Sequence, residues 1–141
     1  MTGEQNKSVV RRVIEQAFNR GKVESLEELF TPNYREHQFG MPPNIEGLKA
    51  SVRALRAAFP DLKLTIEEMS AESEKVWVRM TARGTHGGEF MGVPPTGRKI
   101  QISVFDMCRL EDGRITDHWG VPDRFAIMHQ IGALSAPSRA N

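Results

Sequence analysis

Asp106 is the residue whose position most directly suggests chemistry. Alternate side chains of an extended segment share one face. The row that contains Asp106 is otherwise apolar and consists of Ile100, Ile102, Val104, Asp106, Cys108 and Leu110. A carboxylate in such a row is costly unless it is paired, and perturbed carboxylates concentrate at functional sites. Two interpretations stay open: a general base for a bound molecule, or a structural ion pair with an arginine of the next strand, such as Arg79.

His118 and Trp119 are adjacent candidates in the last extended segment. Neighbours on a strand point to opposite faces, so Asp117, Trp119 and Val121 share one face and His118 takes the other. His118 is a candidate catalytic group, with a structural role as the alternative. If Trp119 lines a cavity, His118 faces away from it, and the sequence leaves open which of the two points inward.

Hydrophobic periodicity predicts the elements that position these residues. Apolar residues at helical spacing predict helices over about 5–20, 25–30, 46–59 and 123–131. Alternation predicts strands over 62–67, 75–86, 99–110 and 115–121, with a short extended piece over 34–39. Helices that precede sheet hairpins indicate an α+β fold, with the helices packed on one face of a curved, mostly antiparallel sheet. The tail from about residue 135 is expected to be frayed.

Composition restricts the classes of function. A chain of 141 residues fits one domain, 1–141. Its net charge of +1 gives no general attraction to nucleic acid or to anionic lipid. The first residues contain no apolar leader segment, and no stretch approaches the ~20 apolar residues of a membrane span. The single cysteine, Cys108, cannot form an internal disulfide, and we expect a buried thiol in a cytoplasmic protein.

Known motifs for metals, nucleotides and serine hydrolases do not occur. The four histidines lack the paired spacing of a metal site, and we therefore expect no metal and no bound cofactor. The sequence contains no Gly-x-Gly-x-x-Gly, no Walker loop and no Gly-x-Ser-x-Gly elbow.

Two long stretches resemble a known family, the SnoaL-like polyketide cyclases or ester cyclases. They are ARGTHGGEFMGVPPTGRKI (82–100) and FDMCRLEDGRITDHWGVPDRFAIMHQIGAL (105–134), and the similarity extends to 18–37 and 55–69. The resemblance implies a nuclear transport factor 2-like cone, in which helices and a curved sheet enclose the active-site cavity. It also implies a homodimer joined through the sheets. The implied reaction is an intramolecular aldol closure without metal or cofactor, started by an acidic residue near the last strand.

The resemblance adds candidate residues to the site. Asp123 follows the last strand where the family places its acid, although an Asp before a helix is also a good N-cap. Tyr34 and His37 lie in the piece that lines the cavity mouth in this fold, where His37 could donate to a substrate carbonyl. Arg109 stands where the family pattern can carry a histidine, and an arginine cannot shuttle protons at neutral pH. The remaining candidates for substrate contact are Phe59, Trp77, Arg79 and Trp119.

Three functions follow as hypotheses. The first is a cofactor-independent cyclase or isomerase that uses a carboxylate base on a small polyketide-like or other carbonyl substrate. The second is an epoxide hydrolase, for which Asp106, Arg79 and Asp123 would have to form an Asp–Arg–Asp arrangement. The third is a small-ligand binding protein without turnover, since one fold hosts many functions.

Overall fold

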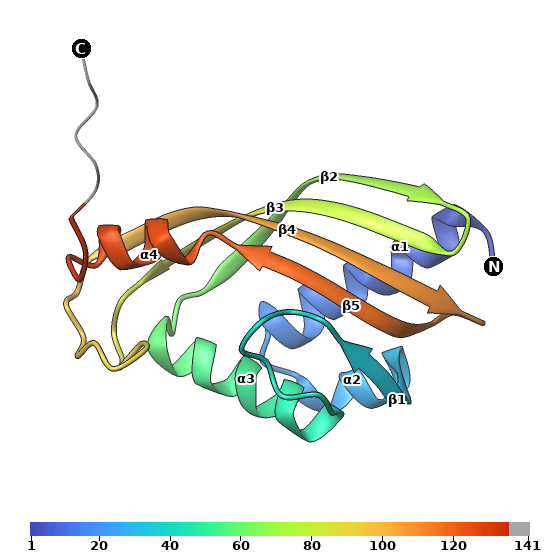
Figure 1. Cartoon of the computed structure of the whole chain (residues 1–141), viewed down its shortest axis with the longest axis horizontal. Helices are drawn as coiled ribbons and strands as arrows, with labels where there is room; N and C mark the ends of the chain where they lie inside the picture. The colour runs from blue at the N-terminus through green and yellow to red at the C-terminus, as the bar shows by residue number, and fades with distance from the viewer. Residues whose placement is uncertain (136–141) are drawn as a thin grey trace, which may run out of the picture.

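The first helix begins with a capping box at Thr2. The Thr2 hydroxyl accepts a hydrogen bond from the Gln5 backbone, and the Gln5 side chain accepts one from the Thr2 backbone. Helix α1 (Gly3–Arg12) continues directly as a π-helix, η1 (Val13–Phe18), so the expected single helix changes its winding halfway. This computed structural model describes residues 1–135 (Figure 1). Most of the tail for which fraying was expected lies outside the described residues.

Three short elements follow before the second long helix. A 3₁₀ turn, η2 (Val23–Ser25), leads into α2 (Leu26–Leu29), and β1 (Phe30–Glu36) begins at once. The expected extended piece is therefore longer at its start, because Phe30 belongs to the strand and not to the helix. Helix α3 (Ile45–Ala58) begins at Asn44, whose side chain accepts a hydrogen bond from the Gly47 backbone.

The remaining chain forms a curved sheet. Strands β2 (Lys63–Glu72), β3 (Lys75–Thr85), β4 (Lys99–Glu111) and β5 (Arg114–Pro122) pair antiparallel in sequence order, as expected. The edge strand β1 pairs parallel with β5, which gives the order β1-β5-β4-β3-β2. Helix α4 (Arg124–Gln130) follows β5 (Figure 1). The architecture is the expected mixed α+β fold, with the N-terminal helices against one face of the sheet.

A bulge in β5 decides which side chains face inward. Asp112 and Gly113 both have positive φ in the β4–β5 turn, as the Asp-Gly pair predicts, and Leu110 pairs with Ile115. The register then shifts, and Arg109 pairs with Asp117. Thr116 is the extra residue, so Ile115 and His118 both face the helices. The inward-facing positions of β5 therefore change at Thr116, from odd-numbered residues such as Ile115 to even-numbered residues such as His118.

Candidate active site

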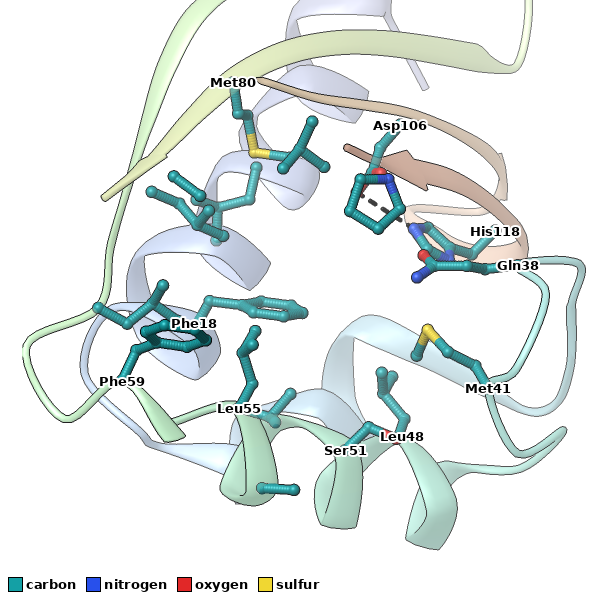
Figure 2. Close-up of a pocket in the computed structure, with 18 of the residues that line it drawn as sticks. Phe18, Gln38, Met41, Leu48, Ser51, Leu55, Phe59, Met80, Asp106 and His118 are labelled. Carbon is teal, nitrogen blue, oxygen red and sulfur yellow. Dashed lines mark hydrogen bonds and ion pairs between the residues drawn. The ribbon is translucent and has the colours of Figure 1, made fainter. Parts of the chain in front are cut away.

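A cavity of about 450 Å³ lies between the inner face of the sheet and the helices. Its walls are mainly apolar. Phe18 of η1, Leu55 of α3, Met80 of β3 and Phe59, which directly follows α3, line one part of it, while Gln38, Asp106 and His118 gather at one end (Figure 2). A cavity with an apolar body and a few convergent polar groups is the usual form of a small-molecule site.

Three ionisable side chains meet at the polar end. Asp106 on β4 faces the cavity, as alternation along that strand predicts. Its Oδ2 lies 3.2 Å from Nε2 of His118 on β5 (Figure 2). Nδ1 of the same imidazole lies 2.7 Å from Oε2 of Glu36 on β1. Oδ1 of Asp106 is buried and has no hydrogen-bond partner in the described part of the chain.

This arrangement favours the charged form of His118. Burial alone would lower the pKa of His118, but hydrogen bonds to Asp106 and Glu36, together with their negative charges, outweigh it and raise the pKa to about 10. An imidazolium carries N–H on both ring nitrogens and therefore donates to both carboxylates. The free atom Oδ1 of Asp106 is then the group available to accept a proton from a ligand.

Close packing around Asp106 depends on Gly120. Gly120 stands directly opposite Asp106 on β5. A Cβ at this position would overlap Oε1 of Gln38 and would lie 2.7 Å from Oδ1 of Asp106. Only glycine therefore allows the Gln38 amide and the Asp106 carboxylate to occupy their places together. Cys108 is buried beside them, as expected, and burial raises the pKa of its thiol.

Several expected site residues lie on the opposite face of the sheet. Asp117 is buried there and binds Arg35 through two hydrogen bonds of 2.8 and 3.1 Å. His37 lies 3.0 Å from Asp117, and its ring stacks on Trp119. Arg109 reaches Asp117 at 3.3 Å. His37, Arg109 and Trp119, three of the predicted site residues, therefore do not line this cavity.

Arg79 and Trp77 also face away from the cavity. Val78, and not Arg79, pairs with Asp106 across the ladder, and Arg79 binds Glu68 at 2.9 Å. The suggested Asp106–Arg79 ion pair is thus not formed, and strand parity places Arg79 on the opposite face of the sheet from Asp106. Trp77 is 39% exposed on the same outer face.

Two other candidates have local structural contacts. Asp123 is the N-cap of α4, where its Oδ1 accepts a hydrogen bond from the Ala126 backbone at 3.0 Å, and it does not line the cavity. Tyr34 is buried against Phe30 with its hydroxyl 3.5 Å from the Asn44 carbonyl, also outside the cavity lining. Burial and the nearby charge of Glu36 raise the pKa of Tyr34. Phe59, in contrast, lines the cavity.

Glu36 and Gln38 are site residues that sequence reasoning missed. The signal was present, because alternation over 34–38 places Tyr34, Glu36 and Gln38 on one face. His37, the residue predicted for the site from this segment, lies on the opposite face. What alternation could not supply is the parallel pairing of β1 with β5, which brings Glu36 opposite His118.

Two further findings concern metals and membranes. Among residues 1–135, no group of three or more His, Cys, Asp or Glu side chains is arranged to hold a metal ion. None of the helices in this range has the length and apolar character needed to cross a membrane.

Comparison with known proteins gives matches over most of the chain. A family model described as SnoaL-like polyketide cyclase matches residues 8–131. The aklanonic acid methyl ester cyclase DauD of Streptomyces sp. (strain C5) is 33% identical over 134 residues, which cover 88% of this chain and 80% of that protein. The nogalonic acid methyl ester cyclase of Streptomyces nogalater is 29% identical over 121 residues, covering 82% and 90%.

Solved structures agree with this match. IdmH from Streptomyces antibioticus is 36% identical and superimposes with a TM-score of 0.81, covering 91% of this chain and 99% of that chain. TsrD from Streptomyces laurentii is 28% identical with a TM-score of 0.87, covering 95% and 99%.

Proposed function

The chain belongs to the SnoaL-like polyketide cyclase family, and we propose that it is a cofactor-independent cyclase whose general base is Asp106. The observation that carries this proposal is the convergence of Asp106 and His118 on one largely apolar cavity. A protein that only bound an apolar ligand would not need a buried carboxylate with an unpaired oxygen beside the ligand.

The mechanism follows from the positions of the groups. Oδ1 of Asp106 takes a proton from a carbon next to a carbonyl, and the C–H electron pair becomes an enolate. The enolate carbon forms a C–C bond with a second carbonyl of the same molecule, and the resulting alkoxide takes the proton back from Asp106. His118 holds Oδ2 of Asp106 in place, and the Gln38 amide, which lines the same end of the cavity, would donate to the enolate oxygen.

The shape of the cavity supports a polyketide-like carbonyl compound as substrate. The volume of about 450 Å³ suits a molecule of several fused or linked rings. Its apolar part would hold the rings by burial, while the reacting carbonyl group lies at the end formed by Gln38, Asp106 and His118. The esters named for DauD and the nogalonic acid cyclase are therefore reasonable first substrates to test.

Proton exchange tests the proposal on simple carbonyl compounds as well as on larger ones. We would incubate the protein with a panel of β-keto esters in D₂O and follow deuterium uptake by NMR, together with ring closure of aklanonic acid methyl ester. Asp106→Asn should lower the exchange rate by roughly 10²–10⁴-fold, because it removes the base.

Asp123→Asn is the matched comparison, since asparagine keeps the helix cap. A large loss in Asp123→Asn with little loss in Asp106→Asn would refute the assignment of the base. No exchange by the unmodified protein on any member of the panel would refute the proposed chemistry and favour a binding protein.

We also propose a homodimer formed through the outer face of the sheet. This face carries a patch of large apolar side chains that line an open groove: Trp77, Phe105, Met107, Trp119 and Val121. Phe105 is 56% exposed and Val121 70% exposed, and exposed apolar patches of this kind mark association surfaces.

A cytoplasmic location fits the buried free thiol of Cys108, and cell fractionation would test it.

A further inference from the structure

A second carboxylate lies behind His118, on the side away from Asp106. The side chain of Glu36 has no exposed surface. Because β1 pairs parallel with β5, Glu36 stands opposite His118 in the ladder. Its Oε2 accepts hydrogen bonds from the Gln38 backbone at 3.1 Å and from Nδ1 of His118 at 2.7 Å. Glu36 does not line the cavity, so it does not touch a bound molecule.

We propose that Glu36 is a positioning residue, whose charge keeps His118 doubly protonated and directs its Nε2–H at Asp106. The consequence for catalysis rests on the proposed function, whereas the effect on His118 can be measured without any substrate.

The geometry of the ring carries the inference. Both imidazole nitrogens face a carboxylate oxygen, at 2.7 and 3.2 Å. A neutral imidazole has one N–H, so one nitrogen lone pair would face a carboxylate lone pair. A doubly protonated ring satisfies both contacts. Burial opposes this charge, and two flanking carboxylates compensate for it better than one.

The other groups around the ring do not replace Glu36. Cys108 pairs with His118 across the β4–β5 ladder, and Tyr34 precedes Glu36 on the same face of β1. The pKa values of both side chains are raised, chiefly by burial, so both are neutral near pH 7. Helix α3 presents Ser51 and apolar side chains to the cavity, and Arg124 lies at the start of α4 beside Gly40.

The charged ring determines which group acts as base. An imidazolium has no free lone pair and cannot accept a proton from the substrate. It donates to Oδ2 of Asp106 and leaves Oδ1 as the acceptor. Glu36 also balances the positive ring, so the three side chains together carry one net negative charge next to the reacting carbon. Without Glu36, the ring would lose its second proton at a lower pH, and the neutral ring would then compete with Asp106 for the proton.

NMR of the His118 ring tests the proposal directly. In the unmodified protein at neutral pH, the ¹⁵N shifts should show both nitrogens protonated. Glu36→Gln keeps the size and an acceptor oxygen but removes the charge, and the His118 titration midpoint should fall by roughly 1–3 pH units. The alkaline limit of the proton-exchange rate should move down by the same amount. Glu111→Gln, at the end of β4, is the matched control and should leave the midpoint unchanged.

Each result has a defined meaning. A neutral ring in the unmodified protein, or the same midpoint in Glu36→Gln, would overturn the role of Glu36. If Glu36→Gln does not fold, two other measurements decide the question. One is the ¹⁵N measurement on the unmodified protein. The other is the titration of Glu36→Asp, which keeps the charge and should retain a high His118 midpoint. Failure of the proposed function is distinguishable, because the unmodified protein would then exchange no substrate proton while the His118 midpoint still responded to Glu36→Gln.

Discussion

Gly120 links local packing to the chemistry of Asp106. The two residues stand opposite each other, and Gln38 reaches over the glycine. In Gly120→Ala, the added methyl group would overlap Oε1 of Gln38 and press on Oδ1 of Asp106, so at least one of these side chains must move. Misplacement of a catalytic group by about 1 Å can cost on the order of 10²-fold in rate. We therefore expect a loss of this size in the deuterium-exchange assay.

The melting temperature of Gly120→Ala, measured by thermal unfolding, serves as the control. It should differ little from that of the unmodified protein if only these two side chains move. A variant that exchanges at the normal rate would show that the close approach of Gln38 and Asp106 has no functional role.

Asp117 joins three strands. It lies on β5 and binds Arg35 of β1 and Arg109 of β4. The hydrogen bonds from Arg35, with further ones from His37 and Thr116, hold the pKa of Asp117 well below its ordinary value of 3.8. A depressed folded-state pKa gives stability that is present in full above the ordinary value and is lost as the pH falls toward the folded-state value.

Asp117→Asn should therefore lower the free energy of unfolding by about 2 kcal/mol near neutral pH. The gap between the two proteins should narrow below about pH 4, where the unfolded chain begins to bind a proton at Asp117. Urea unfolding at a series of pH values measures this gap. A gap that stayed constant down to about pH 2.5 would contradict this stabilising role of the ionised Asp117.

The limits of sequence reasoning are visible in the same strands. Alternation along β4 was enough to place Asp106 inward, because a two-residue period is a local property. The orientation of His118 was not accessible in this way. Counting forward in steps of two from Ile115, which pairs with Leu110, puts Trp119 inward, and the extra residue Thr116 reverses that result. The bulge is a feature of the pairing between β4 and β5, which the local pattern of one strand does not encode. The resemblance drew attention to Asp123, which in the structure caps α4 outside the cavity.

The sheet separates the candidate active site from the proposed dimer surface. Its inner face carries the cavity and the Glu36–His118–Asp106 contacts, and its outer face carries the ion pairs of Asp117 and the apolar patch around Phe105. Neighbouring residues of β5 serve opposite faces, as His118 and Trp119 do. The patch and the cavity can therefore be altered separately, which makes the dimer proposal testable without damage to the site.

Phe105→Glu is the variant that tests the dimer. In a two-fold symmetric interface the same patch is used twice, so one substitution introduces two buried charges. We expect sedimentation equilibrium to report a dimer for the unmodified protein and a monomer for Phe105→Glu, with the deuterium-exchange rate largely retained.

Phe125→Glu is the matched control, because Phe125 is 53% exposed on α4, outside the patch, and its replacement should leave the dimer intact. A monomeric unmodified protein, or a Phe105→Glu dimer of unchanged affinity, would refute association through this face. The apolar patch would then need another occupant, because exposed aromatic side chains this close together are seldom left in contact with water.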